Sequence, residues 1–220
     1  MEIKKTFVNL LLRWYGENGR DFVWRRKSDP YQILIAEIML QRTKASQVEP
    51  VYIDFLKRFP DPQKLNQASE KEIGEYFSRL GLLWRTILVK RLARELIDKF
   101  RGEVPNNRNK LLSLPAVGEY MADAVLSFAY GKDIAVVDAN VCRIIARVFG
   151  IRSRSEARRD RKFRKIAQEL LPLGRAKEFN WAMIDFAALI CTPRTPKCGT
   201  CPMNEFCFYH QQFSAKNNAE

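Results

Sequence analysis

Four cysteines near the end of the chain have the clearest potential for chemistry. Cys191, Cys198, Cys201 and Cys207 are separated by six, two and five residues in the segment CTPRTPKCGTCPMNEFC. The segment is too short and too rich in proline for a regular helix or strand. Thiolates at such spacing bind zinc or an iron–sulfur cluster, and the four ligands alone do not choose between the two.

The rest of the chain indicates that these thiols are reduced. Two disulfides would require an oxidising compartment, and the N-terminal segment MEIKKTFVNLLLRWYG has apolar residues at helical spacing broken by charges, unlike a signal peptide. No apolar run approaches the ~18 residues of a membrane span. We therefore expect a cytoplasmic protein without membrane contact. The fifth cysteine, Cys142, lies in the apolar segment VCRIIARVF and is expected to be a small buried hydrophobe.

A second chemical element lies in the middle of the chain, in residues 110–131. Two helical stretches flank a tight turn, Leu114-Pro115-Ala116-Val117-Gly118. Such a turn directs backbone N–H groups at a helix N-terminus toward an anion, which predicts a phosphate site at Val117 and Gly118. The alternative is an ordinary antiparallel pair of helices.

The overall charge favours a polyanionic partner. Lys and Arg number 38 against 25 Asp and Glu, for a net charge of +13 and a pI near 9.7. The 46% of apolar residues supply a packed core, and 220 residues suffice for one large domain or two small ones.

The elements that position these groups are expected to be helices throughout. Apolar residues recur at helical spacing, short punctuated loops separate the segments, and no alternating run demands a sheet, so the fold is predicted to be all-α. The expected helices are 4–15, 31–43, 45–58, 70–80, 86–100, 108–113, 120–130, 139–148, 160–171 and 176–190. The polar end SAKNNAE is expected to fray.

Several motifs in order resemble the helix-hairpin-helix DNA glycosylases of the endonuclease III and MutY superfamily. They are WRRKSDPYQILIAEIMLQRT, LGLLWR, LPAVGEYMADAVLSFAYG, VVDANVCRI and the four cysteines. The resemblance implies two helical lobes, 22–133 with the hairpin at its end and 1–21 with 134–220, separated by a DNA cleft. It also implies a [4Fe–4S] cluster on the four cysteines. Ala116 departs from the family, whose hairpin usually has glycine there.

The family implies chemistry on a base flipped out of double-stranded DNA. Breaking the glycosidic bond builds oxocarbenium character on the sugar, which a nearby carboxylate stabilises or relieves by activating water. Asp138, in Val136-Val137-Asp138-Ala139-Asn140, resembles the family's catalytic aspartate. Its place before a helix also suits an N-cap, and the residues alone leave these two interpretations even.

Position 120 decides the expected reaction type. Family members with lysine there form a Schiff base with the sugar and cut the strand. Tyr120 cannot form an imine, so we predict a monofunctional glycosylase that leaves an abasic site. The alternative for Tyr120 is a buried aromatic at the start of the second hairpin helix.

The base removed is expected to be thymine or uracil opposite guanine, as in the archaeal MIG-type mismatch glycosylases. Tyr120 and Arg42 match that branch, whereas MutY has glutamine at position 42. The chain also ends 13 residues after Cys207, without room for the C-terminal domain of MutY. The alternative is a MutY-type adenine glycosylase acting on adenine opposite guanine or 8-oxoguanine.

The remaining candidates divide into a base pocket and a DNA surface. Glu37 lies on an apolar helix, where burying an unpaired charge is costly. It is therefore expected to line the base pocket and to take part in catalysis. Trp24, Arg25 and Trp181 are expected to line the same pocket, although Trp181 also suits a helix-face core position.

Gln41, Arg42, Leu82 and Asn140 are expected to contact DNA. Arg42 would bind the estranged guanine or fill the gap, with a phosphate contact or a solvated charge as alternatives. Leu82 matches the family's wedge loop. The basic stretch Arg152 to Lys165 is expected to be a solvated helix face, with a phosphate contact as the alternative. The partner is therefore mismatched double-stranded DNA, bound by a nucleoid-associated monomer.

Overall fold

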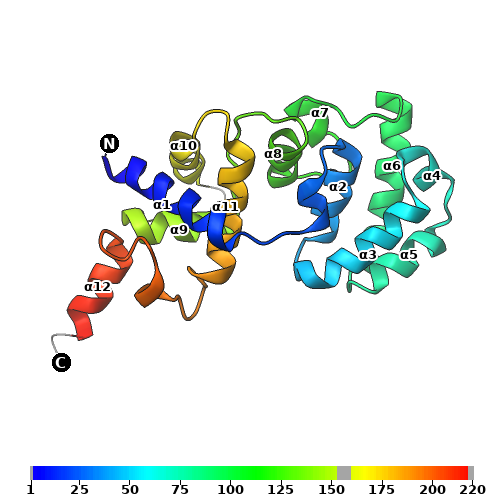
Figure 1. The fold of residues 1–220 in the computed structure, drawn as a ribbon. Coiled ribbons are helices and arrows are strands. Elements are labelled where there is room, and N and C mark those ends of the chain that lie inside the picture. Colours follow the sequence, from blue (N-terminus) through cyan, green and yellow to red (C-terminus); the bar gives the residue numbers. More distant parts are fainter. Residues whose placement is uncertain (1, 153–159, 218–220) are drawn as a thin grey trace. The chain divides into compact units, whose positions relative to one another are not determined.

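A computed structural model describes residues 2–152 and 160–217 of the chain. Every regular element in these ranges is a helix, which confirms the all-α prediction (Figure 1). Part of the basic stretch from Arg152 to Lys165 falls on residues 153–159, outside the described residues. No described helix is long and apolar enough to cross a membrane.

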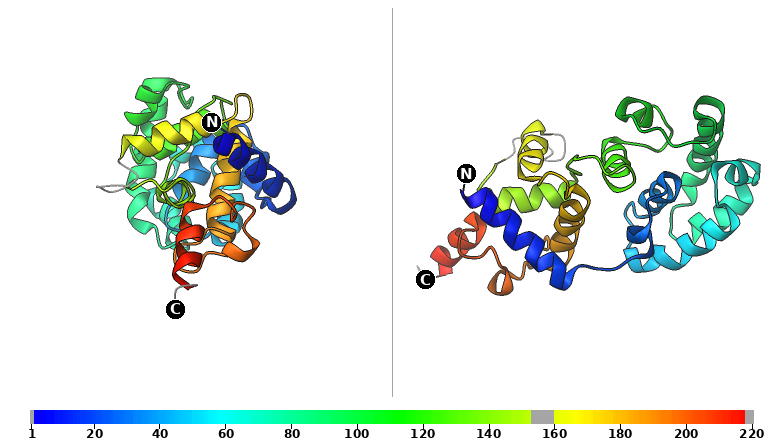
Figure 2. Two further views of the ribbon diagram at one scale, coloured as in Figure 1. Left: turned by 90° about the vertical axis from the view of Figure 1, so that its left-hand side faces the viewer. Right: turned by 45° about the horizontal axis from the view of Figure 1, so that its top comes forward.

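The chain forms two compact units. Unit 2 comprises Asp21–Gly131, and unit 1 comprises Met1–Arg20 together with Lys132–Glu220. The chain therefore leaves unit 1 once, completes unit 2, and returns through the segment that begins at Lys132. Figure 2 shows the same elements from two further directions.

Unit 2 is built around one apolar helix. Its elements are η1 (Val23–Arg26), α2 (Pro30–Met39), α3 (Ala45–Arg58), α4 (Pro62–Gln67), α5 (Glu70–Ser78), η2 (Leu83–Arg85), α6 (Thr86–Phe100), α7 (Arg108–Leu112) and α8 (Glu119–Phe128). Eight of the ten residues of α2 are buried, and α3 and α8 pack against this helix. A helix that is apolar all round forms a core rather than a surface.

Short sequence signals set the starts of these helices. Asp29 caps α2 by accepting a bond of 2.8 Å from the Gln32 N–H, with Pro30 at the first helical position. Asp61 and Pro62 repeat this pattern at α4, a helix that the expected set lacked. The Asp-Pro pair was the available signal.

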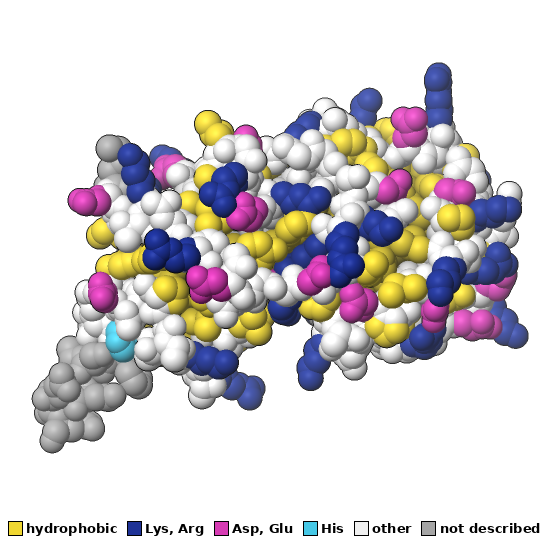
Figure 3. Space-filling view, in the orientation of Figure 1, with side chains coloured by type: hydrophobic (Ala, Val, Ile, Leu, Met, Phe, Trp, Pro, Cys, Tyr) yellow, Lys and Arg dark blue, Asp and Glu magenta, His cyan; other side chains and the backbone are white. Residues whose placement is uncertain are grey.

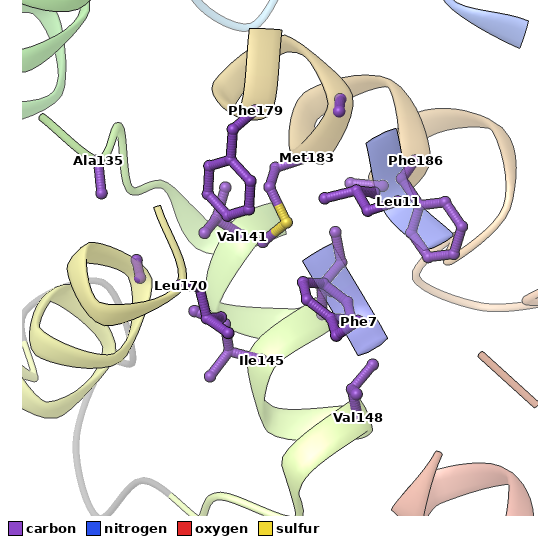
Figure 4. Close-up of a cluster of buried hydrophobic side chains, with 14 of the residues drawn as sticks. Phe7, Leu11, Ala135, Val141, Ile145, Val148, Leu170, Phe179, Met183 and Phe186 are labelled. Carbon is purple, nitrogen blue, oxygen red and sulfur yellow. The ribbon is translucent and has the colours of Figure 1, made fainter. Parts of the chain in front are cut away.

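In its described residues, unit 1 packs six helical elements around a second core. They are α1 (Glu2–Asn18), α9 (Ala139–Phe149), α10 (Arg161–Leu170), α11 (Ala176–Leu189), η4 (Cys198–Thr200) and α12 (Phe208–Asn217). Helices α1 and α9 both pack on α11, and α9 also contacts α10 and α12. Phe7, Ile145, Phe179 and Phe186 point into this core (Figure 4), which also buries Cys142 as expected. Helix α12 falls partly on the stretch expected to fray.

Candidate functional site

Asp138 is fixed at the start of α9. Its Oδ1 accepts the backbone N–H groups of Asn140 at 2.9 Å and Val141 at 2.8 Å, and its Oδ2 accepts Asn140 Nδ2 at 2.7 Å. The residue is only partly buried. Asp138 is therefore an N-cap, which was one of its two interpretations beside that of a catalytic aspartate. The cap leaves the carboxylate held in one orientation at a partly open surface.

Arg143 extends this arrangement along α9 to the cysteine loop. Its Nη1 donates to Asn140 Oδ1 at 2.8 Å, and its Nε donates to the carbonyl oxygen of Cys191 at 2.9 Å. The side chain of Asn140, expected on the DNA surface, thus donates to Asp138 and accepts from Arg143. A continuous chain of hydrogen bonds runs from Cys191 to Asp138.

The segment before Asp138 is held by two side-chain amides. Gln168 accepts from the Ala135 N–H at 3.0 Å and donates to the Asp133 carbonyl at 2.9 Å. Asn180 accepts from the Val136 N–H at 3.0 Å and donates to the Ile134 carbonyl at 2.8 Å. The extended segment leading into Asp138 therefore has its backbone groups satisfied by amides from α10 and α11.

The four terminal cysteines lie in the segment that follows α11, and Cys191 and Cys207 are buried. Burial and the neighbouring thiols of Cys207, Cys191 and Cys198 raise the pKa of Cys201 to about 11. Four thiolates in one segment are the donor set that an iron–sulfur cluster takes. The donor set therefore fits the cluster.

Arg147 ties the same loop to α9. Its Nη1 donates to the Thr192 carbonyl at 2.7 Å and its Nη2 to the Pro193 carbonyl at 2.8 Å. Its guanidinium also lies over the ring of Tyr209 at 4.7 Å from the centroid. One turn apart on α9, Arg143 and Arg147 bind successive carbonyls at the start of the loop, and only Arg143 also contacts Asn140.

In unit 2 the predicted hairpin is present, with an uncapped second helix. Gly118 is the N-cap residue of α8, and no side chain accepts the first N–H groups of that helix. Ala116 adopts φ 65°, a left-handed conformation that favours glycine, which explains the family preference. Arg108 of α7 bonds Asp123 of α8 at 2.7 Å and fixes the two helices together. Val117 is buried, and its N–H donates to the Leu114 carbonyl at 3.3 Å.

Glu37 and Tyr120 lie on helices that pack together. Glu37 is 6% exposed on α2, and Tyr120 is half-buried in the first turn of α8. Helices α2 and α8 are in contact. A carboxyl group at this depth in an apolar helix is expensive to desolvate, which supports the expectation that Glu37 has a specific role.

The loop after α2 contains Gln41 and Arg42, and Arg42 has an unusual backbone conformation. Arg42 is exposed and adopts φ 63°, which is rare for a non-glycine residue. Gln41 Oε1 accepts from Nη2 of Arg85, a residue 7% exposed. The loop is thereby joined to η2.

Leu82, expected as the wedge, is turned inward and only 5% exposed. The Leu82 N–H donates to the Phe77 carbonyl at 2.8 Å, and the Gly81 N–H donates to the Ser78 carbonyl at 3.0 Å. With Gly81 at φ 69°, this is the Schellman end of α5, whose following residue packs back on the helix. Leu82, the expected wedge, is thus buried here, and Leu83 and Trp84, each 59% exposed, are the open side chains of the loop.

The three expected pocket residues have different surroundings. Trp24 is 4% exposed, stacks on Phe22 at 4.8 Å and meets Tyr52 edge-on, so it belongs to the core of unit 2. Arg25 is half-buried over the same Phe22 ring. Trp181, on α11 of unit 1, carries the Lys177 ammonium 4.9 Å from its ring centroid.

The comparisons with known proteins fit this arrangement. A family described as HhH-GPD superfamily base excision DNA repair protein matches residues 35–172, and the iron–sulfur binding domain of endonuclease III matches residues 191–207. The chain is 40% identical to a thymine/uracil-DNA glycosylase of Pyrobaculum aerophilum, over 94% of this chain and 92% of that protein.

The chain belongs to the HhH-GPD superfamily. A thymine/uracil-DNA glycosylase of Methanothermobacter thermautotrophicus is 38% identical over 96% of both chains. The structure of a thermostable thymine-DNA glycosylase superposes with a TM-score of 0.89 at 37% identity, covering 96% of this chain and 98% of that one.

The match to the iron–sulfur binding domain of endonuclease III decides the cofactor. It confirms the expected [4Fe–4S] cluster over zinc, and its bounds, residues 191–207, contain the four expected ligands Cys191, Cys198, Cys201 and Cys207. Arg143, which connects this segment to Asp138 through Asn140, and Arg147, which binds only the segment, were not among the expected site residues. Both follow Asn140 at helical spacing on one face of α9, a signal that the sequence offered.

Proposed function

We propose that the protein is a monofunctional DNA glycosylase that removes thymine or uracil mispaired with guanine and leaves an abasic site. The observation that carries this proposal is the similarity to thymine/uracil-DNA glycosylases along nearly the whole of both chains. The fixed carboxylate of Asp138 and the uncapped helix α8 are the features that a base-removing DNA enzyme needs. The working form is a monomer on mismatched double-stranded DNA.

Asp138 acts on the sugar. As the glycosidic bond breaks, positive charge grows on the sugar ring, and a carboxylate already held in place stabilises it without reorganisation. Asn140 and the backbone N–H of Val141 keep that carboxylate oriented. Glu37 contacts the flipped pyrimidine or orders a water molecule. The cluster, when bound, ties the terminal loop down, and four thiolate ligands leave it no open position for hydrolysis.

Two groups of unit 2 hold the DNA. The N–H groups at the start of α8 bind a backbone phosphate, which positions the duplex without reading its sequence. Arg42 offers its fork of donors to the estranged guanine. Each contact comes from a different loop, so affinity and base recognition are separable by mutation.

Tyr120 limits the reaction to hydrolysis. Replacing it by lysine supplies an amine, and we expect Tyr120→Lys to trap as a covalent adduct with substrate DNA on borohydride reduction. Wild type and Tyr120→Phe are the controls and should give no adduct. Absence of any trapped Tyr120→Lys species would place residue 120 away from the sugar.

Base release measures the function directly. In single-turnover reactions on labelled duplexes carrying G·T, G·U, A·G and A·8-oxoguanine, followed by alkali, we expect cleavage of the T and U strands alone. Cleavage of the A strand would instead assign a MutY-type adenine activity. No cleavage of any strand would overturn the glycosylase proposal.

A further inference from the structure

Three large apolar side chains are exposed within five consecutive positions of unit 2. Leu83 and Trp84 are each 59% exposed and Ile87 is 56% exposed. They lie on η2 and the first turn of α6 and are called here the Trp84 patch. Single exposed hydrophobes are normal, but a group of this kind marks a binding surface. Figure 3 shows one face of the molecule, on which apolar side chains lie exposed among lysines and arginines.

A buried cation lies directly behind Trp84. The Arg85 guanidinium carbon is 4.3 Å from the centroid of the Trp84 ring. Arg85 is 7% exposed, its Nε is buried without a hydrogen-bond partner, and no carboxylate pairs with it in the described part of the chain. Burial and the nearby Arg42 lower the pKa of Arg85. A buried charge without a counterion is costly, which suggests that a ligand completes this site.

The patch is continuous with the loop after α2. Arg85 contacts Trp84 through the cation–π interaction and Gln41 through a hydrogen bond, so the three side chains form one connected group. Arg42, in its left-handed conformation, follows Gln41 directly. Left-handed backbone at a non-glycine residue persists where the surroundings enforce it, often at ligand sites. The aromatic face of Trp84 and the buried cation of Arg85 are thus connected to the loop that carries the exposed Arg42.

We propose that Trp84 stacks on the unpaired guanine left opposite the flipped-out pyrimidine, with Arg85 holding the indole from behind. This inference rests on the proposed function. An indole face stacks on any base, and an indole already fixed by a cation loses little freedom on binding. Arg42 at the neighbouring position presents donors to the guanine edge. DNA supplies the negative charge that the two arginines lack.

The test compares two duplexes of one sequence. One carries guanine opposite a tetrahydrofuran abasic analogue, and the other is fully paired. We expect wild type to prefer the first, and Trp84→Ala to reduce that preference about 10-fold, the loss of ~1.4 kcal/mol of stacking. Trp84→Phe should retain most of it. Leu173→Ala, which removes an 84% exposed hydrophobe from unit 1, is the control and should change nothing.

Arg85→Met separates recognition from folding. Because Arg85 is buried without a counterion, the apolar replacement should leave Tm unchanged or raised while reducing the preference for the abasic duplex. A merely structural Arg85 would instead lower Tm and leave the preference intact, which would overturn its assigned part.

The outcomes distinguish this inference from the proposed function. An unchanged preference in Trp84→Ala, or an equal loss of affinity for both duplexes, would overturn the stacking assignment even if wild type releases thymine and uracil. The stacking assignment also fails if wild type shows no preference for the abasic duplex. Failure of wild type to release either base would overturn the glycosylase proposal whatever Trp84 does.

Discussion

Helices α8 and α9 begin in opposite ways. Helix α9 starts at Asp138, whose carboxylate accepts two backbone N–H groups of its first turn. Helix α8 starts at Gly118, and no side chain caps it. Both are helix N-termini whose first N–H groups lack a partner within the helix and lie at the positive end of the dipole. Helix α9 uses them to hold a carboxylate of the chain, whereas we propose that α8 offers them to an anion from outside.

Under the proposed function, this difference lets one backbone feature serve two roles. A side-chain carboxylate in the cap is oriented and ready for chemistry, but it excludes phosphate from that helix end. A glycine cap contributes no oxygen, and its N–H groups bind phosphate. Substitutions at or near the start of each helix can therefore remove the carboxylate cap of α9 or introduce one at α8.

The largest effect is expected from Asp138→Asn. Asparagine is also a good N-cap, so the fold should persist, while the loss of the negative charge beside the sugar should reduce single-turnover base release roughly 10³-fold. DNA affinity should change little. Asp160→Asn is the matched control, because Asp160 caps α10 with a bond of 3.0 Å to the Lys162 N–H. Comparable activity of the two variants would show that Asp138 is only a cap.

A smaller loss of rate is expected from Arg143→Leu. Without its bond to Asn140, the Asp138 carboxylate loses support, and a small misplacement should cost about 10- to 100-fold in base release with DNA affinity nearly unchanged. Arg143→Lys should recover part of the rate.

Arg147→Leu is the control for the loop. It removes the bonds to Thr192 and Pro193 but none to Asn140. We therefore expect weaker retention of the cluster, measured as a loss of iron absorbance. Enzyme that still carries a full cluster should release the base at nearly the wild-type rate. If both variants slow base release equally at equal iron content, the link through Asn140 is not what orients Asp138.

Local patterns predicted the N-cap at Asp138, the metal-binding segment of the four cysteines and the positions of most helices. A carboxylate before an amphipathic run, thiols at close spacing and apolar periodicity are short-range signals. The burial of Leu82 also follows from a local signal: Gly81 ends α5 in a Schellman motif, which turns the next apolar residue inward.

Other features depend on contacts that no local pattern reveals. Gln168 and Asn180 lie more than thirty residues beyond the segment they hold, and Arg85 lies 44 residues from Gln41. A polar residue on an amphipathic helix gives no indication of its distant partner. Burial of Arg85 was equally unpredictable, because an arginine between Trp84 and Thr86 is typical of a surface position.

Gly118→Asp would make the start of α8 resemble that of α9. Gly118 has extended backbone, and a Cβ there meets nothing within 4 Å, so the aspartate fits. Because glycine is itself an acceptable N-cap, the aspartate should stabilise α8 by only about 0.3 kcal/mol. It should nevertheless weaken binding to matched and mismatched duplexes alike by about 10-fold, through occupation of the N–H groups and repulsion of phosphate. Gly118→Ala is the control without a capping oxygen. Undiminished binding by Gly118→Asp would mean that no phosphate occupies this helix end.

The smallest effect is expected from Ala116→Gly. Ala116 at φ 65° carries a left-handed strain that glycine relieves, while glycine adds freedom to the unfolded chain. The net gain should be about 0.5–1 kcal/mol, or a rise in apparent Tm of ~1–4 °C. Ala129→Gly, at φ −95°, relieves no strain and should lower Tm instead. Because the turn keeps its path in Ala116→Gly, the N–H groups of α8 keep their direction and DNA affinity should not change. A gain in stability accompanied by a loss of affinity would mean that the strain itself holds the phosphate site open.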